Sequence, residues 1–197
     1  MSKPSQPVAV VTGANRGIGA EIARQLAQQG FFVFVASRHP HDGELVAAAL
    51  RASGGHAKAL ALDVTDAASV ARAAETVRGE VGQIDVLVNN AGVALEGFNL
   101  DVVQRTLAVN FYGAARTTDA FLPLLAAHGK VVMVSSGMAD RGALGPSLRT
   151  QFSQPLSRAE LFALVQQFEQ AVATGHHRAQ GWPQSAYRVS KMALNVL

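Results

Sequence analysis

Two residues near the end of the sequence have side chains suited to proton transfer. Tyr187 and Lys191 are four residues apart in Tyr-Arg-Val-Ser-Lys, so on a helix their side chains lie on one face. An ammonium group beside a phenol stabilises the deprotonated phenol, which makes the phenol a better proton donor. The pattern therefore suits protonation of a carbonyl oxygen. Taken alone, such a pair is also common on exposed helix surfaces.

A second candidate site is a glycine-rich segment near the start of the chain. Glycines permit a tight turn and close approach to a pyrophosphate, and the N-terminus of a following helix offers N–H groups to the anion. A glycine-rich loop alone can also be a turn without a ligand. The segment follows Thr12, and its expected cofactor contacts are Gly13, Asn15, Arg16, Gly17, Ile18 and Gly19.

The elements that must position these residues alternate along the chain. Short apolar runs predict strands buried on both faces, and the stretches between them carry apolar residues at helical spacing. This alternation predicts an α/β fold with a Rossmann-type doubly wound parallel sheet, in the order 3-2-1-4-5. The predicted strands are Val8–Thr12, Phe31–Ala36, Ala57–Leu62, Val86–Asn89 and Lys130–Val134, and the helical stripes include Ile18, Ile22 and Leu26, then Val102, Thr106, Leu107 and Phe111.

The pattern changes after Ser136, because residues 137–186 contain no strong strand. Ser157 followed by Glu160 is a capping box that predicts the start of a helix, and Gly175 predicts its end. Between them one apolar stripe is expected to be buried, formed by Leu161, Leu164, Val165, Phe168 and Val172.

Composition sets the class of protein. Of the 197 residues, 49% are hydrophobic and 16% charged, and 17 basic residues against 14 acidic ones leave too small a surplus for a nucleic-acid surface. The absence of cysteine excludes disulfides and thiol catalysis, and no metal site is expected. No apolar run is long enough for a membrane helix, and the first residues do not resemble a secretory signal. A cytoplasmic location is therefore expected.

Several motifs together resemble the short-chain dehydrogenase/reductase family. The glycine spacing is Gly-x-x-x-Gly-x-Gly, and it is followed by Asp63-Val64 and then by Asn89-Asn90-Ala91-Gly92. The resemblance implies that Asp63 and Val64 flank the adenine of a dinucleotide, and that Asn90 and Gly92 also contact the cofactor. Read alone, Asp63 could instead be a helix cap.

The same resemblance assigns four catalytic residues. Tyr187 would protonate the carbonyl oxygen as hydride arrives, and Lys191 would support it and bind the nicotinamide ribose. Ser136 would stabilise the developing negative charge on the substrate oxygen, with Ser135 the less favoured candidate. Asn110, in Leu-Ala-Val-Asn, would hold a water near the lysine.

The end of the second predicted strand indicates which nicotinamide cofactor is used. NAD-selective members carry an acidic residue there, whereas this chain has Ser37 and Arg38. Arg38 and Arg16 could clamp a 2′-phosphate, because a guanidinium binds phosphate in bidentate fashion. NADPH is therefore expected, although two exposed surface arginines are the alternative.

The insertion at 137–186 and the stretch from Gly181 to Tyr187 resemble the monomeric carbonyl reductases of the family. A monomer is expected, because the inserted helix could cover a surface that other members use for pairing. Trp182 could line the substrate pocket or belong to the core. His176 and His177 are interpreted as solvated loop residues, since adjacent histidines point in different directions.

Residues 1–197 are expected to form a single but incomplete domain of this family. Family members continue past the Tyr-Lys helix with further strands, a Pro-Gly segment and a lid, which would lie beyond Leu197. The predicted function is NADPH-dependent reduction of a small aldehyde, ketone or quinone. The alternatives are a non-catalytic nucleotide-binding or interaction module and an NAD-linked hydroxy-compound dehydrogenase.

Overall fold

The structure is a computed structural model that describes residues 6–197, so part of the segment examined for a secretory signal lies outside the described residues. The chain forms two compact units. The first consists of the residues up to Ala91 together with Gly113–Val134, and the second of Gly92–Tyr112 together with Ser135–Leu197. The prediction of one domain over residues 1–197 stays a prediction.

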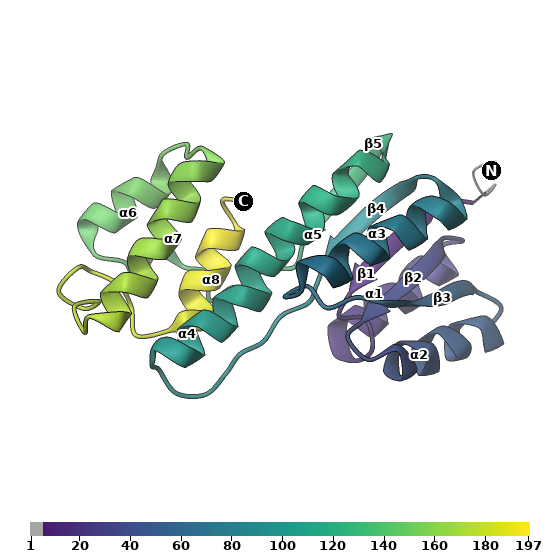
Figure 1. Ribbon diagram of the computed structural model, residues 1–197, viewed down its shortest axis with the longest axis horizontal. Helices are drawn as coiled ribbons and strands as arrows, with labels where there is room; N and C mark the ends of the chain where they lie inside the picture. The colour runs from purple at the N-terminus through teal and green to yellow at the C-terminus, as the bar shows by residue number, and fades with distance from the viewer. Residues whose placement is uncertain (1–5) are drawn as a thin grey trace. The chain divides into compact units, whose positions relative to one another are not determined.

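The first unit contains a parallel sheet whose strand order is β3-β2-β1-β4-β5 (Figure 1). This confirms the predicted order and fold class. The pairs β1 with β2, β1 with β4, β2 with β3, and β4 with β5 are all parallel. The strands are β1 (Val8–Thr12), β2 (Phe32–Ser37), β3 (His56–Ala61), β4 (Ile84–Asn89) and β5 (Leu125–Met133).

Helices lie on both faces of this sheet, as a doubly wound fold requires. α1 (Gly17–Gln28) and α2 (Pro40–Ala52) pack together over one face. On the other face α3 (Ala67–Val81) packs against α5 (Ala114–Phe121), which is followed by the short 3-10 helix η2 (Leu122–Leu124) (Figure 1).

The prediction that every strand is buried on both faces holds for β1 and is wrong for β3 and β5. In β3 the side chains of His56, Lys58 and Ala61 are exposed, and in β5 Val132 is exposed. Both strands stand at the ends of the strand order, where the covering helices leave more of the sheet open to water. Lys58 uses this exposure to form an ion pair with Glu80 of α3.

The predicted apolar stripe of α1 is partly buried. Ile22 and Leu26 are half-buried and pack against the core of the first unit, whereas Ile18 is 67% exposed. The fully buried face of the helix consists of Gly19, Ala23 and Ala27, whose small size brings the helix backbone close to the strands. The turn that precedes α1 is thereby held close to β1.

The second unit is helical. α4 (Leu100–Leu107) continues into a π-helical turn, η1 (Ala108–Gly113), and the remaining elements are η3 (Arg141–Ala143), α6 (Pro146–Ser153), α7 (Arg158–Ala173) and α8 (Ala186–Leu194). The sequence indicated neither α6 nor the π-turn. α8 ends at Leu194, three residues before Leu197.

The inserted helix α7 forms as its sequence predicts. Ser157 accepts a hydrogen bond from the backbone N–H of Glu160, whose carboxylate accepts one from the Ser157 N–H, which completes the capping box. Gly175, with φ of 74°, follows the C-terminus. Of the expected stripe Leu161, Leu164, Val165 and Phe168 are fully buried, Val172 is half-buried, and Ala171 joins them.

A half-buried polar pair ties α7 to the π-turn. The Tyr112 hydroxyl donates a hydrogen bond of 2.8 Å to Glu169 Oε2, and Phe111 and Phe162 pack around the Tyr112 ring. Burial, together with the bond to the Glu169 carboxylate, raises the pKa of Tyr112 well above its ordinary value. The pair therefore stabilises the neutral phenol in the folded second unit.

This pair predicts how stability responds to pH. Because the folded pKa of Tyr112 is raised, its contribution is complete below the ordinary tyrosine pKa of about 10 and is lost as the pH rises above it. Tyr112→Phe should lower the free energy of unfolding by about 1 kcal/mol at neutral pH and weaken the loss of stability above pH ~10. Fluorescence of Trp182, the single tryptophan, reports unfolding of this unit.

Glu169→Gln is the matched control, since it keeps an acceptor for the hydroxyl and removes the charge. It should cost less than Tyr112→Phe. Identical unfolding curves for Tyr112→Phe and the unaltered protein at both pH values would contradict the contribution of this hydrogen bond.

Candidate active site

The glycine turn between β1 and α1 is built around close backbone contacts. Gly13 and Gly17 have φ of 62° and 54°, in the region where side chains are strained. A Cβ on Gly19 would lie 2.4 Å from Asn90 Nδ2 and 2.5 Å from the Gly13 carbonyl oxygen. The turn thus requires glycine at these positions, and Arg16, Gly17 and Ile18 remain exposed at the N-terminus of α1. This is the arrangement that a pyrophosphate needs.

Two polar side chains support the turn from beneath. The buried Thr12 hydroxyl accepts hydrogen bonds of 3.0 Å from the N–H groups of Asn90 and Ala91, and donates one to the Val88 carbonyl. The Asn90 side-chain amide donates to the carbonyl oxygens of Thr12 and Gly13. Asn90, expected as a cofactor contact, therefore also fixes the shape of the turn. No role was predicted for Thr12. Its place at the end of β1, directly before the glycine turn, was the signal that could have indicated one.

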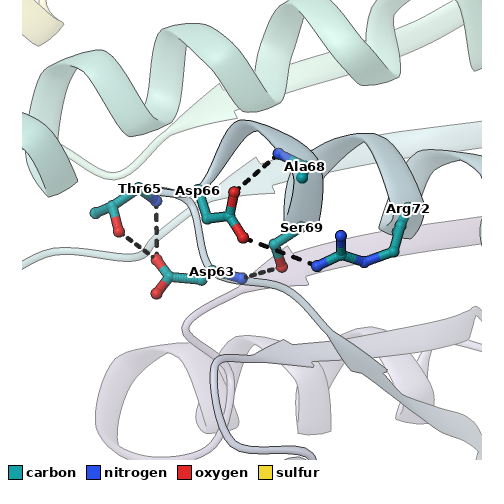
Figure 2. A network of polar contacts seen from close by, with 6 residues as sticks. All are labelled: Asp63, Thr65, Asp66, Ala68, Ser69 and Arg72. Carbon is teal, nitrogen blue, oxygen red and sulfur yellow. Dashed lines mark hydrogen bonds and ion pairs between the residues drawn. The ribbon is translucent and has the colours of Figure 1, made fainter.

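The Asp63 side chain lies in a turn before α3 and does not cap that helix. Its Oδ1 accepts hydrogen bonds from the backbone N–H and the hydroxyl of Thr65, while its own N–H donates to Ser69 Oγ (Figure 2). The N-cap is Asp66, which accepts from the Ala68 N–H and pairs with Arg72. The alternative that Asp63 is the helix cap is thus wrong, and its second carboxylate oxygen points away from this network (Figure 2).

Arg38 follows β2, as expected, and its side chain is exposed. The neighbouring Ser37 is buried, and its hydroxyl donates to the His39 carbonyl oxygen over 2.8 Å. This bond shapes the turn into α2 and leaves Arg38 as the charged group at the strand end. Arg38 and Arg16 both belong to the first unit, and both are available to an anionic ligand.

Tyr187 and Lys191 occupy successive turns of α8 in the second unit. Ser185 caps this helix by accepting from the Arg188 N–H. Lys191 Nζ lies 5.9 Å from the centre of the Tyr187 ring, and Lys191 is only 4% exposed. Burial lowers the pKa of the Lys191 ammonium below its ordinary value. A buried ammonium beside a half-buried phenol suits exchange of a proton with a bound substrate.

Ser136 and Ser135 have different surroundings. Ser136 Oγ accepts a hydrogen bond of 3.1 Å from the Met138 N–H, and within residues 6–197 its own hydroxyl hydrogen has no acceptor. The Ser136 hydroxyl can therefore donate a hydrogen bond to a substrate oxygen. The Ser135 hydroxyl instead points to the Lys191 carbonyl oxygen, at 3.5 Å. The contacts agree with the preference for Ser136.

Asn110 is fully buried in the π-turn, and its side chain forms three hydrogen bonds. Its Oδ1 accepts from the Val93 N–H at 2.8 Å, and its Nδ2 donates to the Val93 carbonyl at 2.9 Å and to Ser190 Oγ at 3.0 Å. All three partners belong to the second unit. The side chain that was expected to hold a water is therefore itself a structural connector, with both amide hydrogens in use.

Two further expectations concern the insertion. Trp182 is 3% exposed and packs against Phe152 and Phe168, so the structure favours its role in the core over a place in the substrate pocket. His176 is exposed, but the interpretation of His177 as solvated is wrong. The His177 ring packs against the Phe98 ring in a tilted arrangement, with 4.8 Å between the ring centres, and its nitrogens are buried. Within the described part of the chain, no three His, Asp or Glu side chains gather as metal ligands.

With this geometry in place, comparison with known proteins identifies the family. The family model described as short chain dehydrogenase matches residues 7–147. The chain belongs to the short chain dehydrogenase family. Human carbonyl reductase [NADPH] 1 is 36% identical over 200 residues, which cover 96% of this chain and 72% of the relative.

Solved structures of the family share the fold. Menthone neomenthol reductase from Mentha piperita has a TM-score of 0.90 and 29% identity, covering 98% of this chain and 83% of its own. A metagenomic short-chain oxidoreductase in complex with NADP has a TM-score of 0.68 and 31% identity, covering 96% and 72%. Across residues 6–197, the structure shows no helix with the length and apolar character to cross a membrane.

The close contacts at Gly19 predict a selective loss of cofactor binding. Gly19→Ala would place a methyl group against Asn90 Nδ2 and the Gly13 carbonyl, so the turn must open and NADPH affinity should fall by a factor of roughly 100. Fluorescence titration of bound NADPH measures the affinity.

Gly79→Ala is the control for this substitution. Gly79 lies within α3, and a Cβ there meets nothing within 4 Å, so the change should stabilise the helix by about 1 kcal/mol and leave NADPH affinity unaltered. Equal affinities for all three proteins would contradict the role assigned to the Gly19 contact.

Proposed function

We propose that this protein reduces the carbonyl group of a small aldehyde, ketone or quinone with NADPH. The observation that carries the proposal is the pairing of Tyr187 with the buried Lys191 on α8, in a chain of the short chain dehydrogenase family. The similarity to carbonyl reductase [NADPH] 1 supports both the reaction and the cofactor.

The first unit has the groups to hold NADPH. The glycine turn and the N-terminus of α1 would bind the pyrophosphate, Asp63 and Val64 would flank the adenine, and Arg38 with Arg16 would bind the 2′-phosphate. The fit rests on the tight packing at Gly19, where a Cβ would collide with Asn90 and the Gly13 carbonyl and so force open the turn whose backbone would face the phosphates. Asn15 and Gly17 of the first unit are proposed as further contacts, and so is Gly92, which belongs to the second unit.

When bound, NADPH supplies the hydride. Tyr187 donates a proton to the carbonyl oxygen, and the Ser136 hydroxyl, which keeps its hydrogen, donates a hydrogen bond to the same oxygen as negative charge develops on it. Lys191 stabilises the deprotonated Tyr187, and because burial lowers its own pKa it can pass a proton back to the phenolate. A water near Asn110 would replace that proton, although both amide hydrogens of the Asn110 side chain are already bonded to Val93 and Ser190.

The proposal includes a monomeric state and a cytoplasmic location. The apolar stripe of α7 is buried within the second unit by the residues of its own chain, which supports the view that the insertion takes the place of a partner. Sedimentation at several concentrations and fractionation of cells that express the protein test these two points.

Cofactor choice is tested at Arg38. Arg38→Ala should weaken NADPH binding by about 1 to 3 kcal/mol, the contribution of a hydrogen bond to a charged group, and leave NADH binding almost unchanged. The control is Arg78→Ala, which removes an exposed arginine that pairs only with Glu75. An equal loss for NADPH and NADH in fluorescence titration would refute the assignment, and tighter binding of NADH would favour an NAD-linked dehydrogenase.

The proton donor is tested by exchanging each of the two tyrosines in turn. Tyr187→Phe should reduce turnover of a panel of aldehydes, ketones and quinones by a factor of at least about 100, with NADPH binding retained. Tyr112→Phe, which lies outside the proposed catalytic set, should keep most of the activity. Substantial turnover by Tyr187→Phe would exclude this role, and NADPH binding without any turnover in the unaltered protein would indicate a non-catalytic nucleotide-binding module.

A further inference from the structure

Ser190 is a buried hydroxyl inside the catalytic helix that no step of the reaction uses. It lies between Tyr187 and Lys191 in sequence and is 0% exposed. Serine is a poorer helix former than alanine, and a buried hydroxyl destabilises a protein unless it is hydrogen-bonded. Alanine would therefore suit this position better if the helix alone determined the choice.

The Ser190 hydroxyl instead connects two functional segments. It donates a hydrogen bond of 2.8 Å to the carbonyl oxygen of Tyr187, one turn earlier in α8. It also accepts a hydrogen bond of 3.0 Å from Asn110 Nδ2, which comes from the π-turn η1. The Ser190 oxygen thus accepts a hydrogen bond from the Asn110 side chain, and the hydroxyl donates one to the backbone of Tyr187, the proposed proton donor.

The Asn110 end of this connection is itself fixed. Its remaining amide hydrogen and its carbonyl oxygen are both bonded to the backbone of Val93, at 2.9 and 2.8 Å. An asparagine side chain offers two N–H donors, and both are used here. Loss of the Ser190 oxygen would leave one of these donors without a partner in a fully buried place.

We propose that Ser190 is a positioning residue for carbonyl reduction, which acts by holding α8 to Asn110. This inference rests on the proposed function. The bond fixes the turn of α8 that carries Tyr187, and with it the next turn, which carries Lys191. Without it the helix can shift against η1, and proton transfer is sensitive to displacements of less than 1 Å. The groups proposed to bind the NADPH phosphates lie in the first unit and are unaffected.

Turnover provides the first test. Ser190→Ala should lower kcat by about tenfold while the KM for NADPH changes by less than about twofold, because the loss falls on the chemical step. Ser190→Thr, which keeps the hydroxyl, should recover most of kcat. Ser190→Cys, a near-isosteric but weaker hydrogen-bonding residue, should lie between them.

Thr117→Val is the matched control. Thr117 is also 0% exposed, and its hydroxyl bonds only to the Gly113 carbonyl within its own helical segment. It should leave kcat unchanged. Loss of kcat in Ser190→Ala cannot come from a weaker helix, because alanine has the higher helix propensity. The proposal would be overturned if Ser190→Ala left kcat unchanged. It would also be overturned if kcat fell as much in Ser190→Thr as in Ser190→Ala while Ser190→Cys stayed fully active.

Hydrogen exchange provides a second test that needs no turnover. The Val93 N–H is protected by Asn110 Oδ1, so release of Asn110 in Ser190→Ala should speed exchange of this amide by about tenfold, relative to the amides of β1 in the first unit. Ser190→Thr should restore protection. If the unaltered protein binds NADPH but reduces nothing, the proposed function fails. Exchange of the Val93 amide still tests whether Ser190 holds Asn110, and equal exchange rates in Ser190→Ala and the unaltered protein would overturn that connection.

Discussion

The hydrogen bonds of the buried Asn110 side chain connect three segments of the second unit. An amide in this position must satisfy two donors and an acceptor without water, and each one left unpaired would cost about 1 to 3 kcal/mol. Val93 and Ser190 supply the partners, so the segment that opens this unit and the helix α8 are both fixed by the requirements of one residue. Asn110 lies in the π-turn at Ala108–Gly113, and this wider turn changes the direction of the side chains that follow α4.

In the first unit, too, polar side chains fix backbone segments through hydrogen bonds. Asn90 is an expected cofactor contact and Thr12 is not, yet the side chains of both form hydrogen bonds with the protein backbone. They hold the glycine turn in a shape where the backbone itself is presented to a ligand. Both units therefore use buried polar side chains to fix the groups that would touch the ligand or substrate, and this explains why Thr12 and Ser190 matter without contacting either.

Features that depend on local pattern could be predicted from the sequence, and features that depend on distant packing could not. The strand order follows from the alternation of strands and helices, and α7 follows from Ser157, Glu160 and its apolar spacing. Ile18 belongs to the apolar stripe predicted for α1 but is exposed, and Gly19 is buried instead because only a glycine fits against Asn90 and the Gly13 carbonyl. His177 was wrongly taken as solvated because its partner, Phe98, is distant in sequence. Asp63, Tyr187 and Asn110 could be singled out by motif, but their hydrogen-bond partners could not.

The insertion at residues 137–186 packs in one core cluster with α8, the helix that carries Tyr187 and Lys191, and so helps to hold that helix in place. The inserted segment contributes Phe152, Phe168 and Trp182 to the core of the second unit, where they belong to one cluster with residues of α4 and α8. Trp182 contacts Phe152 and Phe168, which come from α6 and α7, so these helices are joined through one indole ring. Since side chains in a close-packed core transmit displacement to their neighbours, a cavity made in the insertion would be felt at α8. The segment that separates Ser136 from Tyr187 in the sequence is thus the same segment that packs against the helix on which Tyr187 lies.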